Sequence, residues 1–119
     1  MPHVVVYGLS KYEVMEEHRM LELECALVQA VVSVPELKLL QDDVSFAFIT
    51  DSTITTKKAR IVIIVEGLFE KPERTSDVRN ALAHNLAEAF KKHPGNKDRS
   101  VEAFVKRLNP EADGFCSIP

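Results

Sequence analysis

The side chains that most often carry chemistry are scattered along this chain of 119 residues. Four histidines lie too far apart in sequence to form a recognisable set of metal ligands: His3, His18, His84 and His93. Cys25 and Cys116 are also far apart and form no closely spaced pair, so we expect two free thiols rather than a disulfide or a zinc site. The sequence therefore predicts no metal and no cofactor.

Arg74 is a charged residue in an unusual position. It precedes the expected start of a helix at Thr75 or Ser76, where the positive end of the helix dipole mildly disfavours a cation. A planar guanidinium can hold a carboxylate through two parallel hydrogen bonds. From the residues alone, a carboxylate-binding arginine and a solvated arginine both remain open.

Composition and charge narrow the class of protein. Hydrophobic residues make up 45% of the chain and charged residues 28%, as in an ordinary globular protein, and the length favours a single domain over residues 1–119. The net charge is -3, and no run of Lys and Arg alternates with aromatic residues, so nucleic acid is not an expected partner. Each apolar run is shorter than a bilayer span, and no signal-peptide pattern precedes the first. We therefore expect a cytoplasmic protein without a membrane partner.

The first half of the chain has the pattern of strand, helix and strand. A β-branched run predicts a strand over residues 2–7. One long amphipathic helix is expected over residues 12–32, with Ser10 as its cap. Its expected apolar positions are Val14, Leu21, Cys25, Val28 and Val32. Pro35 cannot continue this helix, and residues 44–49 alternate at period two, which predicts a second strand.

The second half repeats this order. A third strand is expected at residues 61–65, and Thr75 or Ser76 caps a second helix. Its predicted apolar stripe consists of Val78, Leu82, Leu86 and Phe90. This helix should end at residues 91–95, where basic residues precede a proline and a glycine, and residues 101–105 form a fourth strand. The other segments are a linker or short edge strand, residues 51–58, and a tail with turn signals, residues 109–119.

A short sequence match supports an internal duplication. Val6-Tyr-Gly-Leu9 and Val65-Glu-Gly-Leu68 are 59 residues apart (65 minus 6), which indicates a pseudo-repeat of residues 2–50 and 60–108. Right-handed crossovers would place both helices on one face of a four-stranded sheet, in an α+β fold. The other face then needs a cover, so we expect the chain to self-associate.

The opening Met1-Pro2-His3, a strand that starts at this proline, two β-α-β units and this length resemble the tautomerase superfamily, especially its fused members of the migration-inhibitory-factor type. The resemblance covers the whole chain. Its sharpest local match is Arg74-Thr-Ser-Asp-Val-Arg79, which is similar to the Arg-Ser/Thr-x-Glu/Asp-x-Lys/Arg segment that opens a helix after a strand in this family. The resemblance implies a homotrimer, because the family closes three such sheets around an axis.

The resemblance also assigns a catalytic role to Pro2. Members of the family lose the initiator methionine and use the exposed proline amine as base or acid. An α-amino group has a reference pKa of about 7.7–8.0, and a nearby cation or a dry pocket lowers this pKa toward the operating pH. A retained Met1 would block the amine. The expected activity is keto-enol isomerisation of a small carboxylate-bearing substrate.

Substrate-binding residues follow from the same resemblance. It places Arg74 beside the proline, where it would hold the substrate carboxylate. Lys38 is similar in position to a lysine that lines the pocket in one branch of the family. Arg107 and Phe115 lie in the last strand and the tail, where family members bring pocket residues from a neighbouring subunit.

One departure from the family pattern leaves alternatives open. The small members carry a second arginine on their second strand, where Asp43 and Ser45 stand here. A related hydratase, decarboxylase or dehalogenase would use the same site. A non-catalytic binding or assembly protein of the same fold is a second alternative. A ferredoxin-like regulatory module, which also contains two β-α-β halves, is a third.

Overall fold

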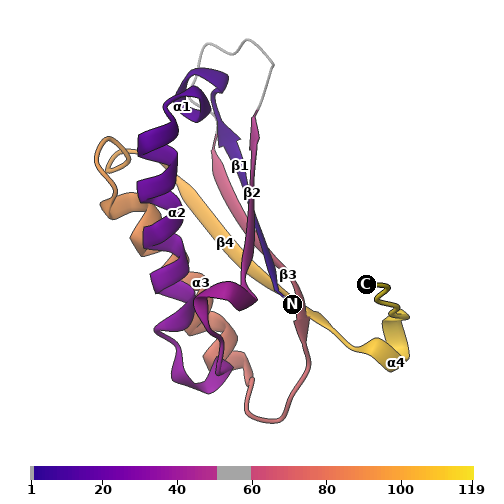
Figure 1. The fold of residues 1–119 in the computed structure, drawn as a ribbon. Coiled ribbons are helices and arrows are strands. Elements are labelled where there is room, and N and C mark those ends of the chain that lie inside the picture. Colours follow the sequence, from indigo (N-terminus) through magenta and orange to yellow (C-terminus); the bar gives the residue numbers. More distant parts are fainter. Residues whose placement is uncertain (1, 51–59) are drawn as a thin grey trace.

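The computed structural model describes residues 2–50 and 60–119. These residues form a four-stranded mixed sheet with two long helices packed on one face (Figure 1). The α+β architecture predicted from the sequence is confirmed. The linker or edge strand predicted at residues 51–58 lies outside the described residues, as does Met1.

The strands of each half are neighbours in the sheet. Their bounds are β1 His3–Leu9, β2 Ser45–Thr50, β3 Ile61–Phe69 and β4 Val101–Leu108, in the order β2-β1-β3-β4. β1 is parallel to β2 and β3 is parallel to β4, whereas the two central strands are antiparallel. In a ferredoxin-like fold another strand would separate the two strands of each unit, so this topology excludes that alternative. β3 and β4 extend beyond the predicted ranges 61–65 and 101–105.

The matching glycines of the two halves form equivalent irregularities. Gly8 and Gly67 both have positive φ, 103° and 73°, and the strand pairing shifts register at each of them. A Cβ atom at Gly8 would lie 2.4 Å from the carbonyl oxygen of Arg60, so a side chain does not fit there. The two bulges return Leu9 and Leu68 to the helix side of the sheet, where each is 1% exposed.

The single helix predicted over residues 12–32 is wrong, because the chain forms two helices there. They are α1 (Lys11–Met15) and α2 (Glu17–Val32), separated by Glu16 in a non-helical conformation. Ser10 caps α1 as predicted and forms a capping box with Glu13. Glu13 also forms an ion pair with Arg99 in the loop before β4. This distant contact holds α1 toward that loop, while α2 turns onto the sheet.

The predicted apolar face of α2 is also wrong. The residues that are buried are Met20, Leu23, Leu27, Ala30 and Val31. Leu21 is 53% exposed and Cys25 is exposed, whereas Val28 and Val32 are partly exposed. Apolar residues occupy two sides of this helix, and the side with more leucine and methionine packs on the sheet. The second side faces solvent in this chain.

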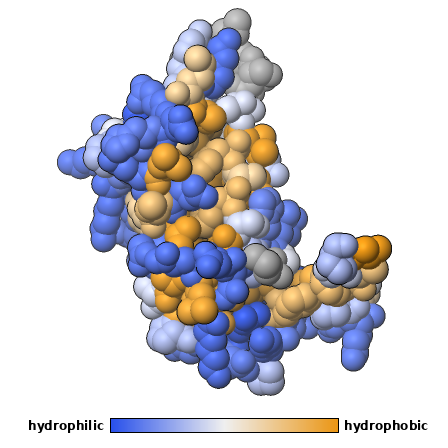
Figure 2. Space-filling model, viewed as in Figure 1, coloured by the Kyte–Doolittle hydropathy of each residue, from blue (hydrophilic) through white to orange (hydrophobic). Residues whose placement is uncertain are grey.

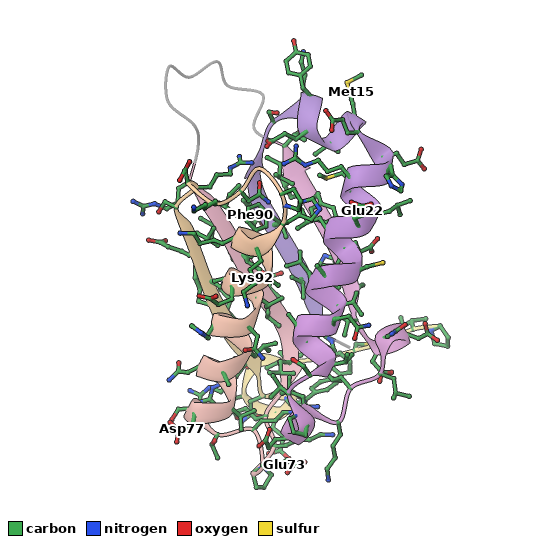
Figure 3. The ribbon with its side chains drawn as sticks, turned by 90° about the vertical axis from the view of Figure 1, so that its left-hand side faces the viewer. Met15, Glu22, Glu73, Asp77, Phe90 and Lys92 are labelled. Atoms are coloured by element: carbon green, nitrogen blue, oxygen red, sulfur yellow. The ribbon has the colours of Figure 1, made fainter. Side chains whose placement is uncertain are left out.

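The second long helix follows the prediction closely. α3 (Ser76–Lys92) is capped by the Thr75 hydroxyl, which accepts a hydrogen bond from the backbone N–H of Val78 at 3.4 Å. The side chains of Leu82, Leu86 and Phe90 are fully buried. α2 and α3 lie side by side across the sheet (Figure 3). Two short 3-10 helices follow α2, η1 (Pro35–Leu37) and η2 (Gln41–Asp43), and the tail contains α4 (Pro110–Asp113).

The two faces of the sheet have different environments. On the helix side, Val4 and Val6 pack against Ile61, Ile63 and Val65 in one core. The open face has an apolar middle made of alternate residues, which are Val5, Tyr7, Ala47, Ile49, Val62, Ile64 and Phe104. Tyr7, Ile49 and Phe104 are 39%, 44% and 42% exposed. Within the described ranges, no helix has the length and apolar character needed to cross a membrane.

Candidate active site at one end of the sheet

The topology brings most of the predicted site residues to one end of the molecule. β1 and β2 begin at this end, and β3 and β4 end there, because the two parallel pairs run in opposite directions. The start of α3 and the 3-10 helix η1 lie at the same end, since Arg74 contacts both Leu37 and Phe69. Figure 3 shows Glu73 and Asp77, which flank the beginning of α3, at the opposite end of the molecule from Met15.

Pro2 is buried at the start of β1. Its carbonyl oxygen accepts a hydrogen bond from the backbone N–H of Ser45 at 3.2 Å, so the ladder between β1 and β2 already holds this residue. The pyrrolidine ring fixes φ. Removal of Met1 would therefore leave a secondary amine at a restrained position rather than on a mobile terminus.

Arg74 is buried, with 8% of its surface exposed. Its Nη1 donates to the carbonyl oxygen of Phe69 at 2.9 Å, and its Nη2 donates to that of Leu37 at 3.1 Å. Its Nε has no partner, and no carboxylate among the described residues forms an ion pair with it. A guanidinium has five N–H donors, so Arg74 retains Nε–H and one N–H on each Nη.

Lys38 lies directly after the carbonyl that Arg74 holds. It is the one non-glycine residue in the described part of the chain with a positive φ, 55°, and its side chain is exposed. A left-handed conformation costs an L-residue roughly 1–2 kcal/mol, and such strain persists where the surroundings impose it. The hydrogen bond from Arg74 to Leu37 is one such constraint. Arg74 thus positions the turn that carries the Lys38 ammonium group.

The structure places Arg107 at the same end but pairs it with an acid. Arg107 Nη1 lies 3.1 Å from Glu70 Oε1, and both side chains are partly exposed. The neighbouring Lys106 Nζ lies 4.0 Å from Glu66 Oε1. Because Arg107 already has a carboxylate partner, it is less available to a substrate than Lys38.

Phe115 packs against the residue that holds Arg74. Its ring meets the Phe69 ring edge-on, with 5.1 Å between centroids, and Phe69 supplies the carbonyl that accepts from Arg74. Phe115 is nevertheless 53% exposed. The contact therefore forms an apolar wall with one side open to solvent.

Two polar residues beside Pro2 were missed by sequence reasoning. His3 Nδ1 lies 2.6 Å from Ser45 Oγ on the open face, and Ser45 also holds Pro2 through its backbone. Glu66 is opposite His3 on the adjacent strand β3. The contact follows from the register of the parallel strands β1 and β2, which sets Ser45 against His3. That register cannot be obtained from one sequence alone.

The structure shows no metal-binding cluster in residues 2–50 and 60–119. No group of three or more His, Cys, Asp or Glu side chains is close enough there to hold an ion. The predicted site residues that the structure brings to this end are a buried proline, a buried arginine without a carboxylate partner among the described residues, an exposed lysine and an aromatic pair.

Comparison with solved structures identifies the fold. A fused 4-OT asymmetric trimer is 19% identical and superposes with a TM-score of 0.68, over 95% of this chain and 91% of that one. A domain of unknown function (DUF1904) from Sebaldella termitidis is 19% identical with a TM-score of 0.65, over 99% and 98% of the two chains. A macrophage migration inhibitory factor-like protein from Entamoeba histolytica is 9% identical with a TM-score of 0.65, over 97% and 95%.

Sequence comparison adds no closer relative. No family model matches the chain, and no curated protein matches it. The structural matches cover nearly the whole chain on both sides. The chain therefore has the tautomerase-type fold, as the resemblance in its sequence predicts.

Proposed function

We propose that this chain, once Met1 is removed, is an isomerase that moves a proton within a small carboxylate-bearing keto or enol acid. The observation that carries the proposal is the position of Pro2, which is buried and held by Ser45 at the end of the sheet that also contains the unpaired Arg74 guanidinium. The fold supports the proposal, since a fused 4-OT trimer shares it.

The proposed mechanism uses Pro2 as both base and acid. The lone pair of its amine takes a proton from the carbon next to a carbonyl, the electrons of the broken C–H bond form a C=C bond, and the carbonyl oxygen takes the negative charge of an enolate. The same amine then returns the proton to another atom of the substrate. An amine with a pKa near the operating pH suits both steps.

The cations at this end hold the substrate carboxylate in the proposal. The exposed Lys38 ammonium contacts it directly, while Arg74 holds the Lys38 turn and adds unfilled N–H donors and positive charge. Phe115 and Phe69 form an apolar wall. Arg107 contributes less because Glu70 balances its charge.

Self-association into a homotrimer is part of the proposal. The open face of the sheet exposes an apolar middle that includes Tyr7, Ile49 and Phe104. Burial of such a face is favourable by roughly 25 cal/mol per Å². Because three sheets of this kind close around an axis in trimers of this fold, light scattering should give three times the chain mass.

The test begins with a protein whose N-terminus is known. Intact mass spectrometry would separate chains that have lost Met1 from chains that retain it. In a keto-enol assay with an aryl or dicarboxylic enol acid, Pro2→Ala should lower kcat by about 10²-fold or more. Lys38→Ala should mainly raise KM, and Lys97→Ala, which changes an exposed lysine outside the proposed site, should change neither. Equal activity in wild type, Pro2→Ala and protein that retains Met1 would remove Pro2 from the mechanism.

A non-catalytic binding protein is the second candidate. The observation that favours it is that both Nη atoms of Arg74 already donate to backbone carbonyls. In that case the carboxylate would bind without turnover, whether or not Met1 is removed. Isothermal titration with an enol acid that is not consumed would show this behaviour. A decarboxylase, hydratase or dehalogenase would instead consume its own substrate class with the same dependence on Pro2.

A further inference from the structure

The open face of the sheet carries a row of polar side chains at the end where the chain begins. The strand register sets Ser45 of β2, His3 of β1 and Glu66 of β3 side by side, because they are direct partners across the strands. Lys106 of β4 extends the row, since its Nζ lies 4.0 Å from Glu66 Oε1. We call these four residues the polar row.

The polar row is the part of the open face that lies nearest to Pro2. Two residues further along each strand, the open face is apolar, with Ala47, Val5, Ile64 and Phe104. Figure 2 shows apolar side chains in the middle of the molecule and mainly hydrophilic ones below them, toward the end where Figure 1 marks the N-terminus. Successive residues of a strand are about 3.3 Å apart. Pro2, which precedes His3, therefore lies within one residue of the polar row.

Within the polar row, the carboxylate lies closer to Pro2 than the ammonium does. β3 is the direct neighbour of β1, whereas β4 lies one strand further away. Because adjacent strands are about 4.8 Å apart, the backbone of Glu66 lies about 5–6 Å from the Pro2 position and that of Lys106 about 10 Å from it. The side chains of Lys106 and Glu66 are 61% and 46% exposed, and such a pair interacts weakly. The charge of Glu66 is therefore only partly balanced.

The other elements around Pro2 contribute charges of both signs, from Lys38, Asp43, Glu70, Arg74, Arg79 and Arg107. Asp43 accepts a hydrogen bond from the backbone N–H of Leu40, and Glu70 is paired with Arg107. Lys38 and Arg74 have no acidic partner among the described residues. Nearby cations favour the neutral form of an amine, and a nearby carboxylate favours the protonated form.

We propose that Glu66 sets the pH at which the Pro2 amine gains and loses its proton. Its carboxylate stabilises the protonated amine and so opposes the cations at this end. Lys106 limits this effect from the far side of Glu66. Glu66 acts on the amine and not on the substrate, so it is a positioning residue. The inference rests on the proposed function only in taking this amine as the working base.

The titration of the Pro2 amine tests the proposal directly. Intact mass spectrometry would verify that Met1 is absent, and methionine aminopeptidase would remove it where it is retained. In protein labelled with ¹⁵N-proline, the Pro2 nitrogen is an amine and every other proline nitrogen is an amide, so its chemical shift follows the protonation of the terminus. Glu66→Gln should lower the midpoint of this titration by about half a pH unit, as expected for one charge about 8 Å away in a largely aqueous setting.

Three further variants separate the charge of Glu66 from its packing and its surroundings. Glu66→Asp keeps the charge and should keep the midpoint near that of wild type. Glu102→Gln removes a carboxylate from the same face, also paired with a cation, but four residues further along β4 than Lys106, and should leave the midpoint unchanged. Lys106→Met should raise the midpoint by a smaller amount. Circular dichroism would verify that all the variants fold.

The activity profile separates this proposal from the proposed function. The pH at which kcat/KM reaches half its maximum reports the pKa of the base in the free enzyme, so in the keto-enol assay Glu66→Gln should lower this pH as much as it lowers the titration midpoint. A shifted titration with an unshifted activity profile would remove Pro2 as the base and leave the effect of Glu66 on the amine in place. The titration itself needs no turnover.

Three results would overturn the role of Glu66. Equal midpoints in wild type and Glu66→Gln would show that its charge does not reach the amine. Equal shifts in Glu66→Gln and Glu102→Gln would reveal a general effect of net charge. A shift in Glu66→Asp as large as in Glu66→Gln would trace the change to packing.

Discussion

The two ends of the sheet each contain a buried arginine, and the two arginines have different partners. Arg99, 7% exposed, forms an ion pair with Glu13 and a hydrogen bond to the carbonyl oxygen of Gly8. Arg74, 8% exposed, contacts only backbone carbonyls among the described residues. Nε is unpartnered in both side chains. The two buried arginines therefore differ by one carboxylate partner, which Arg99 has and Arg74 lacks among the described residues.

This difference separates a structural role from a binding role. Taking a guanidinium out of water costs several kcal/mol, and a carboxylate partner offsets much of that cost. Glu13 is the carboxylate partner of Arg99, and their ion pair also links α1 to the loop before β4. Arg74 has backbone carbonyls alone among the described residues, so a bound carboxylate would balance its positive charge. The proposed function assigns that carboxylate to the substrate.

The largest expected effect comes from removing the ion pair between Arg99 and Glu13. Glu13→Ala leaves Arg99 buried without a counter-ion and also removes the capping box with Ser10. We expect the free energy of unfolding to fall by about 3 kcal/mol, as when one partner of a buried pair is deleted. Urea denaturation would measure it. Glu17→Ala, an exposed neighbour, should change stability by no more than about 0.5 kcal/mol, and an equal loss in both variants would contradict the structural role.

A carboxylate added in solution should act at the other end. At about ten times its dissociation constant, succinate should stabilise the wild type by about 1.4 kcal/mol, which raises the unfolding midpoint by roughly 5 °C. Sodium chloride at equal ionic strength is the reference. Arg74→Met and Lys38→Ala should lose this shift, each relative to its own midpoint, and Arg60→Met, an exposed arginine paired with Glu102, should keep it. The same shift in every variant would exclude an anion site at Arg74.

Acid should first lower the stability of the fold through His93, which is buried at the Arg99 end of the sheet. Burial lowers the pKa of His93 below its ordinary 6.5, and the charge of Arg19 lowers it further, against a smaller opposing effect of Glu22. The unfolded chain then binds this proton more readily than the folded chain, so the stability that His93 contributes is complete above pH 6.5 and declines as the pH falls below it. Unfolding curves between pH 7.5 and 5 should show this decline in wild type and His18→Gln but not in His93→Gln.

A second acid step at that end involves Glu13. Burial alone raises the pKa of its carboxyl, but hydrogen bonds from the Ser10 backbone and from Arg99, together with the charge of Arg99, bring the pKa below 4.5. The stability that this carboxylate provides is present above pH 4.5 and is lost as the pH falls further. The Glu13→Ala variant should lack this step in the same unfolding curves, and a decline below pH 4.5 equal to that of wild type would contradict it.

The smallest expected effect is at Lys38. Lys38→Gly relieves the strain of a positive φ and adds the backbone entropy cost of glycine, and these two terms nearly cancel. We expect the free energy of unfolding to change by less than about 0.5 kcal/mol while succinate binding weakens. Loss of stability without loss of binding would show that Lys38 serves the fold and that Arg74 alone holds the anion.

Local patterns predicted most of the fold. The β-branched runs marked the strands, and Thr75 with Leu82, Leu86 and Phe90 marked the cap and buried face of α3. The repeated Val-x-Gly-Leu segments indicated related halves, and their glycines occupy matching bulges. These features depend on residues a few positions apart, where propensity and periodicity are informative.

The errors arise from contacts between distant residues. Glu13 and Arg99 are 86 residues apart, and their ion pair accompanies the break between α1 and α2 that no local pattern indicates. The choice between two apolar sides of α2 depends on where the sheet lies. At the candidate site, the sequence singled out Arg74, but its burial and its bonds to Leu37 and Phe69 depend on how the loops meet. Pro2 lies at the start of the sheet, as the sequence predicts. The keto-enol assay of Pro2→Ala tests its proposed role.

The edge strand β2, which has no charged residue, is exposed in a chain that has not yet assembled. A newly made chain presents SFAFIT to every other chain in its surroundings, without a lysine or proline to discourage irregular pairing. Assembly and irregular strand pairing use the same exposed chains, so anything that slows assembly leaves more time for aggregation at a given concentration. A variant that assembles slowly should therefore lose a larger share of its chains to the insoluble fraction than wild type at equal total concentration, which sedimentation would measure.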